Sequence, residues 1–165
     1  MIFITVGNAT QGFPRLLKAI ENLGKAGCFG SERMLIQTGS NSSIALEDVE
    51  QIDFLPLEKF LDALCEARVI ISHGGAGTLL QILQLGRIPV VLPREKKFGE
   101  HVDDHQIELV QALALEKRVI PVFQVEDLLQ AISQAGNECK QPRVSNDSQA
   151  LNMVSTAIEE LIGKP

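Results

Sequence analysis

Residues 68–80 join a short β-branched run to an amphipathic helical pattern through a cluster of glycines, in the sequence RVIISHGGAGTLL. This order predicts a strand, a tight turn and a helix. Gly74, Gly75 and Gly77 lack Cβ atoms where the chain must turn sharply and where a ligand can approach the backbone. The first amides of a helix have no partner inside it and lie at the positive end of its dipole. The segment therefore predicts an anion-binding turn, and a turn that serves packing alone is the alternative.

Apolar runs alternate with helical patterns along the rest of the chain. Strands are expected at residues 2–6, 33–37, 50–55, 88–92 and 118–122, and helices at 13–23, 56–67, 125–136 and from Asp103 or Asp104 to about 117. Because the strands are uniformly apolar, we expect a doubly wound, mostly parallel Rossmann-like α/β sheet with helices on both faces. The strand-exit loops of such a sheet meet at one edge, where ligands bind. Loops 7–13, 38–43, 72–78 and 93–105 are expected there.

The length of 165 residues favours one domain. We expect its core at residues 1–136, a polar linker at 137–145 and a C-terminal helix at 146–162. Leu151, Val154 and Ile158 recur on one side of that helix, which is expected either to pack on its own domain or to dock on a partner.

Composition excludes several classes of protein. A net charge of −6 and the absence of Trp and Tyr argue against a nucleic-acid binder. Three widely spaced cysteines predict neither disulfides nor a metal site, which suits a reducing cytoplasm. Residues 1–6 read as a strand rather than a signal peptide, and no apolar run approaches the length of a membrane span. A cytoplasmic protein is expected, held at any membrane by something else.

The glycine cluster fits no complete nucleotide fingerprint. Leu80 stands where the third glycine of G-x-G-x-x-G belongs, although Glu95 lies at the distance expected of a ribose-binding acid. A dinucleotide-dependent oxidoreductase is therefore a weaker alternative. The candidate nucleophiles Ser40, Ser72 and Thr78 lie outside any G-x-S-x-G elbow, which argues against a covalent hydrolase. His73, at the end of the strand, is either a packing residue or a donor to a phosphate or sugar oxygen.

A second polar cluster, GEHVDDHQ, occupies residues 99–106. Its acidic and histidine side chains could suggest a metal site, but Asp103 is better used as a helix cap. Donors and acceptors at a helix N-terminus suit recognition of a polyol, with His105 and Gln106 reaching hydroxyl groups. The cations of the preceding loop, Arg94 among them, either attract an anion or form a solvated surface.

Residues 72–78 and 99–106 resemble the donor-binding half of GT-B glycosyltransferases, and more narrowly the C-terminal domain of glycosyltransferase family 28. The opening TVG at 5–7 and FPRLL at 13–17 are similar to the small soluble subunits of two-piece transferases. These include the eukaryotic subunit that completes dolichol-linked chitobiose and the PssE-type exopolysaccharide subunits. A complete two-domain GT-B enzyme would need about twice this length.

The resemblance implies a UDP-sugar donor with its diphosphate on the glycine turn and helix start. The residues expected to bind it are Gly7, Ser72, His73, Gly74, Gly75, Ala76, Gly77, Thr78, Gln81, Arg94, Glu100, His101, Asp104, His105 and Gln106. The family's ribose-binding acid falls at Gln81, whose amide can bond the ribose hydroxyls without a carboxylate's charge. Gly75→Val or His105→Ala is expected to abolish donor binding or turnover without unfolding the domain.

The implied reaction is inverting transfer of a sugar, with no metal or other cofactor required and the general base in the other half. That half would come from a membrane-anchored partner that binds a polyprenyl-linked acceptor, in polysaccharide or glycolipid biosynthesis. Without its partner the chain is expected to be able to self-associate through an exposed apolar patch. The alternative is a stand-alone nucleotide-binding module without transfer activity.

Overall fold

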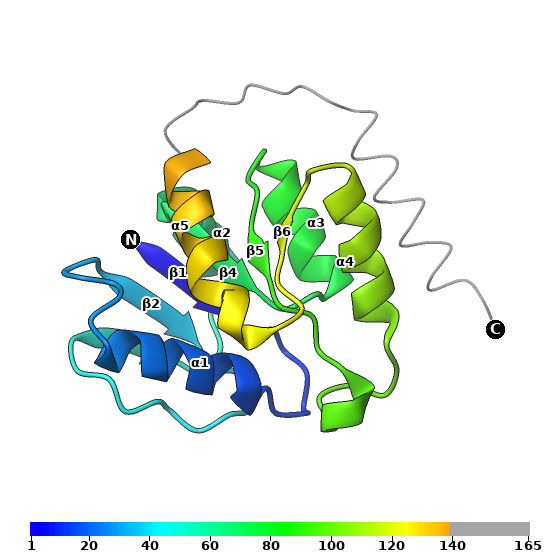
Figure 1. Cartoon of the computed structure of the whole chain (residues 1–165). Helices are drawn as coiled ribbons and strands as arrows, with labels where there is room; N and C mark the ends of the chain where they lie inside the picture. The colour runs from blue at the N-terminus through cyan, green and yellow to red at the C-terminus, as the bar shows by residue number, and fades with distance from the viewer. Residues whose placement is uncertain (139–165) are drawn as a thin grey trace.

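The computed structural model describes residues 1–138 as one parallel sheet between two layers of helices (Figure 1). The strands are β1 (Ile2–Thr5), β2 (Met34–Gln37), β3 (Val49–Ile52), β4 (Val69–Ser72), β5 (Val90–Val91) and β6 (Ile120–Pro121). All pairings are parallel, in the order β3-β2-β1-β4-β5-β6. This confirms the doubly wound fold expected from the alternating pattern. The helix expected at 146–162 and the linker beyond residue 138 lie outside the described residues.

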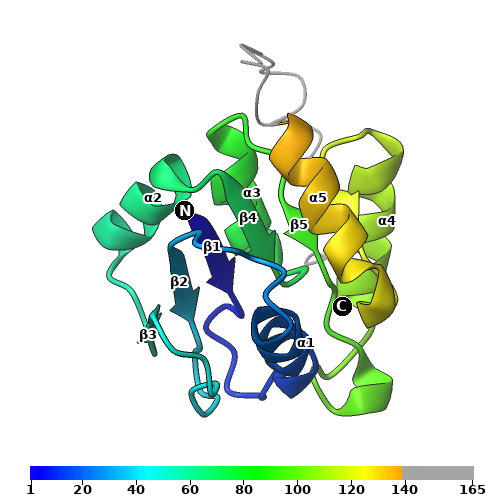
Figure 2. The ribbon, with the colours of Figure 1, turned by 60° about the vertical axis from the view of Figure 1, so that its left-hand side comes forward.

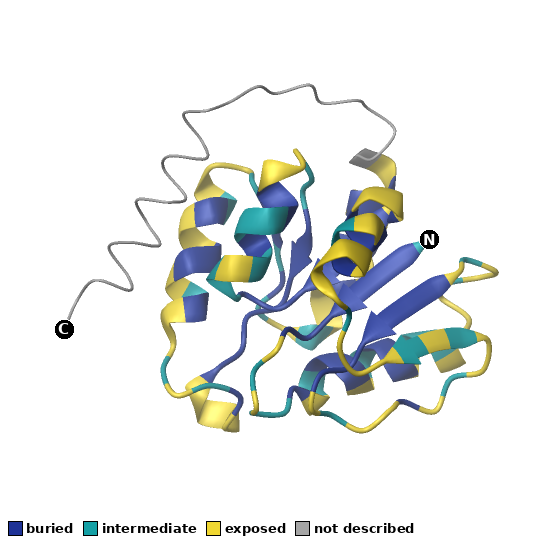
Figure 3. Cartoon of the chain, turned by 180° about the vertical axis from the view of Figure 1, so that it is seen from behind, coloured by how far each residue is buried: buried dark blue, intermediate teal, exposed yellow. Residues whose placement is uncertain are grey.

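The helices are α1 (Pro14–Lys25), α2 (Leu57–Glu66), α3 (Ala76–Gln84), α4 (His105–Leu115) and α5 (Leu128–Glu138), with short 3-10 turns η1 (Lys96–Phe98) and η2 (Val125–Asp127). Helices α1 and α5 cover one face of the sheet, while α2, α3 and α4 cover the other (Figure 2). Seen from behind, these helices turn their exposed residues outward and their buried ones to the strands (Figure 3). None of the helices within 1–138 is long and apolar enough to cross a bilayer.

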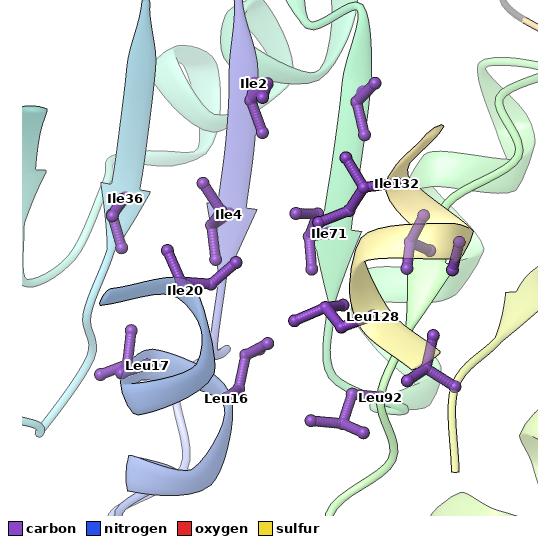
Figure 4. Close-up of a cluster of buried hydrophobic side chains, with 14 of the residues drawn as sticks. Ile2, Ile4, Leu16, Leu17, Ile20, Ile36, Ile71, Leu92, Leu128 and Ile132 are labelled. Carbon is purple, nitrogen blue, oxygen red and sulfur yellow. The ribbon is translucent and has the colours of Figure 1, made fainter. Parts of the chain in front are cut away.

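The larger core cluster lies under α1 and α5. Figure 4 shows Leu16, Leu17 and Ile20 of α1 against the strands, and Leu128 and Ile132 of α5 beside them. All five side chains are buried. Burying such a side chain stabilises the fold by about 1.5–3 kcal/mol, so the sheet is anchored between these two helices.

Strand β3 departs from the uniformly apolar pattern. Its residues alternate between half-buried and exposed, because β3 is the edge strand and pairs only with β2. Gln51 uses its amide to hold the preceding loop: its Oε1 accepts from the Ile44 amide at 2.8 Å, and its Nε2 donates to the Ile44 carbonyl at 3.0 Å. An edge position thus allows polar side chains that a central strand would not.

Strands β5 and β6 are shorter than the apolar runs at 88–92 and 118–122. The runs stay buried beyond the ladder, and single bonds continue the pairing: the Leu92 amide donates to Ser72 at 3.0 Å and the Val122 amide to Val91 at 2.8 Å. An apolar run in the sequence indicates that its residues are buried, whereas a strand also needs a neighbouring strand in register. The runs therefore predict strands that are longer than those observed.

The strand order indicates where on the sheet a ligand site is expected. Thr5 of β1 pairs in register with Ser72 of β4, so the loops after these strands leave the sheet side by side. From β1 the chain builds outward to β2 and β3, and from β4 to β5 and β6. The β1–β4 boundary is therefore the topological switch point, where open α/β sheets form a crevice for ligands.

Candidate functional site

The His73 side chain lies at this switch point, directly after β4. A Cβ atom at Gly7 or at Gly75 would overlap its imidazole ring, so the ring fits between two residues that have no side chain. Gly7 also has a φ of +76°, a left-handed conformation that glycine adopts without strain. The glycines at both positions therefore make room for a histidine ring.

His73 is buried, and its Nδ1 has no hydrogen-bond partner among the described residues. Burial lowers the pKa of His73 to about 3, and the positive charge of Arg94 contributes to the same shift. The imidazole is therefore neutral at physiological pH, with one nitrogen a donor and the other an acceptor. A buried polar atom without a partner is costly in a folded protein. The ring of His73 is therefore a candidate contact for a ligand.

The three glycines of the turn have different surroundings. A Cβ at Gly74 would lie 3.0 Å from Val110 of α4, and one at Gly75 would overlap His73, whereas one at Gly77 would meet nothing within 4 Å. Gly74 and Gly75 thus serve packing, and only Gly77 faces open space. Gly75→Val would consequently disturb the fold, contrary to our expectation from the sequence that it would leave the domain intact.

Helix α3 begins at this turn without a side-chain cap. Gly75 is its N-cap residue, and no side chain bonds the amides of its first turn in the described structure. Those amides carry the positive end of the helix dipole. With open space at Gly77, the helix start can accept an anionic group.

Other side chains of this segment are placed as follows. Ser72 is fully buried, and its hydroxyl donates to the His73 carbonyl at 3.0 Å, so the group faces the protein. Ala76, Thr78 and Gln81 of α3 are half-buried. Thr78 and Gln81 stand three residues apart and therefore share one face of the helix.

The sequence predicts that Arg94 and Glu100 contact a donor, but in the structure both side chains bond other parts of the protein. Arg94 is fully buried and donates to main-chain carbonyls of two loops. Glu100, also buried, accepts from Arg15 Nε at 3.0 Å and Nη2 at 2.9 Å, and from the Glu95 amide at 3.0 Å. Both side chains hold the loops together: groups within the protein bond both Nη atoms of Arg94 and both carboxylate oxygens of Glu100, while Arg94 Nε has no hydrogen-bond partner among the described residues.

Asp103 connects the two histidines of the second cluster, the half-buried His101 and the exposed His105. Its carboxylate lies 2.9 Å from His101 Nδ1 and 3.1 Å from His105 Nδ1, and it accepts from the His105 amide at 3.2 Å. The N-cap residue of α4 is Asp104, whose side chain makes no capping bond, so the expectation that Asp103 is the cap is off by one residue: Asp103 precedes the N-cap and bonds the first helical amide. Asp104 instead accepts from the Lys96 amide at 2.8 Å and stabilises the loop.

His105 and Gln106 do not face the same way. His105 is exposed, whereas Gln106 is buried and its Oε1 accepts from the Arg94 amide at 3.0 Å. Of this pair, His105 is the side chain free to reach a ligand hydroxyl. Within residues 1–138, no group of three His, Cys, Asp or Glu side chains could hold a metal ion, so the metal interpretation of residues 99–106 gains no support.

Sequence patterns did not identify the roles of Arg15 and Asn41. Arg15 pairs with Glu100 and also donates to the Pro93 carbonyl at 2.7 Å. The Asn41 side chain accepts from the Phe13 amide at 2.5 Å and thereby joins the loops after β1 and β2. Both roles depend on contacts between distant loops, for which the sequence carries no local signal.

Comparison with known proteins identifies the family. A model of the glycosyltransferase family 28 C-terminal domain matches residues 1–161. This chain belongs to that family. The match includes the glycine turn and the cluster at 99–106, as the resemblance of these motifs predicted.

Two curated relatives align with this family 28 chain. The UDP-N-acetylglucosamine transferase subunit ALG13 of Homo sapiens is 29% identical over 167 residues, covering 97% of this chain and 14% of that protein. ALG13 of Yarrowia lipolytica (strain CLIB 122 / E 150) is 26% identical over 129 residues, covering 73% of this chain and 63% of that protein. This chain thus spans less than two thirds of either relative.

Among solved structures, the glycotransferase of kitacinnamycin is similar with a TM-score of 0.61 and 17% identity, covering 98% of this chain and 39% of that one. The likeness concerns the fold, and it agrees with the Rossmann-like architecture of the family 28 domain.

Proposed function

We propose that this chain binds the UDP-sugar donor of an inverting glycosyltransferase, as the donor-binding subunit of a two-part enzyme. Its family and the names of its two curated relatives support a UDP-sugar as the ligand. The observation that carries the proposal is the start of α3: uncapped amides beside an open Gly77, with the neutral His73 ring next to the turn.

These groups suit the charge that develops during transfer. The acceptor oxygen attacks the anomeric carbon, the bond from that carbon to the diphosphate breaks, and UDP leaves with the electron pair. Negative charge on the diphosphate grows as the bond breaks, so fixed amides at a helix start stabilise the transition state more than the bound donor. The acceptor's proton passes to a base in the other half of the enzyme, and no metal or other cofactor is needed if these groups neutralise the charge.

The remaining donor contacts are assigned to side chains that are not fully buried. His105 is exposed beside the α4 start and is assigned to the sugar hydroxyls, and Thr78 and Gln81 share the face of α3 that continues from the turn. Gln81 is assigned to the ribose. Arg94 and Glu100 shape the loops without touching the donor.

The second half of the enzyme is assigned to a membrane-anchored partner, which binds a polyprenyl-linked acceptor and holds this chain at the cytoplasmic side of the membrane. The word "subunit" in the names of both ALG13 relatives supports a partner. The products would be polysaccharides or glycolipids.

Calorimetry with a series of nucleotides tests donor binding. UDP should bind, UMP should bind more weakly because it lacks the second phosphate, and NAD should not compete with UDP. Tighter binding of NAD than of UDP would support a dinucleotide-dependent enzyme instead.

Transfer requires a separate measurement. The chain is combined with a candidate membrane-anchored partner and a polyprenyl diphosphate acceptor, and the release of UDP is followed. UDP release only when both proteins are present supports the two-part enzyme. UDP binding without transfer for any partner would identify a nucleotide-binding module.

A further inference from the structure

Arg94 connects the two loops that flank the glycine turn. Its Nη1 donates to the Gln11 carbonyl at 2.7 Å and to the Gly12 carbonyl at 3.2 Å in the loop after β1, and to the Glu100 carbonyl at 3.0 Å in the loop after β5. Its Nη2 donates to the Val6 carbonyl at 2.8 Å. The two loops lie next to each other at the edge where the strands end (Figure 1). One buried side chain thus joins segments that are 82 to 88 residues away along the sequence.

The surroundings of Arg94 make this connection rigid. The residue is fully buried, its guanidinium carbon lies 4.9 Å from the centre of the Phe13 ring, and its amide donates to the Gln106 side chain. The planar guanidinium presents donors in a fixed fork, which one ammonium group cannot reproduce. Hydrogen bonds from a buried charge to carbonyls are also stronger than neutral ones.

The connection reaches His73 through Gly7. Val6, whose carbonyl Arg94 holds, directly precedes Gly7, and Gly7 leaves no room for even a methyl group beside the His73 ring. A displacement of the loop after β1 would therefore open space around the imidazole and admit water. The ring would lose the burial that keeps it neutral.

We propose that Arg94 is a positioning residue, which clamps the loop after β1 onto the loop after β5 and so holds Gly7 against the His73 ring at the glycine turn. The positioning role itself does not depend on the proposed function. Its consequence, a preformed binding site for UDP, rests on that function. The groups that act on the His73 charge are Arg94 and His101 from the loop after β5 and the Thr5 backbone of β1.

The test compares Arg94→Met with Arg87→Met. Arg87 also donates to main-chain carbonyls, those of Leu64, Cys65, Ala67 and Arg68 at the end of α2, so its loss likewise removes bonds to the main chain but does not touch the site. Arg94→Lys is a second variant, which keeps the positive charge and protects the test if the methionine variant fails to fold. Circular dichroism shows which variants are folded.

The first measurement needs no nucleotide. The ring signals of His73 are followed by NMR between pH 5 and 8 in protein labelled at histidine. In the wild type they should not change with pH, because the pKa is about 3. In Arg94→Met they should titrate within this range, in part because the charge of Arg94 is lost. Arg94→Lys keeps that charge, so a smaller shift of the His73 signals in this variant reports the displaced loop, and in Arg87→Met they should not change at all. An unchanged His73 in a folded Arg94 variant, or equal effects of both methionine variants, would overturn the proposal.

The second measurement is the affinity for UDP. Arg94→Met should weaken it at least about tenfold, the equivalent of one lost hydrogen bond to a charged group, and Arg87→Met should leave it unchanged. If the wild type does not bind UDP but the His73 signals respond as expected, the proposed function fails and the positioning role stands. If UDP binds equally well to the wild type and to folded Arg94 variants whose His73 signals are unchanged, the positioning role fails and the proposed function stands.

Discussion

The imidazole of His73 packs directly against the backbone of Gly7, with no space between them for a methyl group. This contact joins the loop after β1 to the loop after β4 at the topological switch point of the sheet. The neutral state of His73, the conformation of Gly7 and the shape of the glycine turn therefore depend on one another. Each can be tested separately.

Gly7→Ala should destabilise the protein by about 2–4 kcal/mol, since it combines a strained left-handed residue with an overlap on His73. Gly27→Ala is the matched control: its φ of +73° is nearly the same, but its Cβ would meet nothing within 4 Å. It should cost only about 1 kcal/mol. Urea denaturation measures both, and equal losses would mean that the His73 contact contributes nothing.

Gly77→Ala should leave the fold intact or stabilise it by about 0.5 kcal/mol, because alanine favours a helix and its Cβ meets no atom here. The same methyl group would stand where a diphosphate approaches the start of α3, so the affinity for UDP should fall. Gln84→Ala, at an exposed position near the other end of the helix, should not alter binding. Calorimetry and thermal melts separate the two effects, and full UDP affinity in Gly77→Ala would move the site elsewhere.

Stability should decrease as the pH falls below about 6.5. The unfolded chain binds a proton on His73 near that pH, whereas the folded protein does so only near its lowered pKa of about 3. Between these values the unfolded state therefore holds more protons, and the loss from this residue at pH 5 is about 2 kcal/mol. Above pH 7 the contribution is constant.

Denaturant unfolding of the wild type and of His73→Gln at a series of pH values measures this contribution. The substitution should flatten the decline between pH 7 and 5, even if it lowers stability throughout. An unchanged slope in His73→Gln would assign the decline between pH 7 and 5 to other groups. The carboxylate of Glu32, whose pKa is lowered to about 2 by Arg68 and the N-terminus, contributes to acid sensitivity only below about pH 5 and so does not confuse this window.

Much of the fold could be predicted because it depends on local patterns. The strand, glycine turn and helix at 68–80 are all present, and the alternation of apolar runs with helical patterns gives the parallel sheet. Strand lengths were less accurate at β5 and β6, because burial continues where pairing stops. Residues 139–165, with the expected C-terminal helix, are not described.

The candidate site was predicted in position but not in detail. His73 and the start of α3 lie together at the ligand edge, as the motif indicated. The motif did not separate Gly74 and Gly75, which serve packing, from Gly77, which faces open space. It also gave no sign that His105 would be exposed and Gln106 buried, since neighbouring residues at a helix start point in different directions.

The amino-acid sequence by itself determined where the chain forms strands, where it must turn without side chains and which edge of the sheet collects the polar loops, because these follow from periodicity and from backbone sterics within a few residues. Only the tertiary structure decided what the charged side chains do. Arg94 and Glu100 look like ligand contacts in the sequence, yet each meets partners far along the chain: Arg94 bonds Val6, 88 residues away, and Glu100 bonds Arg15, 85 residues away. A long side chain binds whatever the folded loops bring within its reach, and burial then decides whether its charge is left for a ligand.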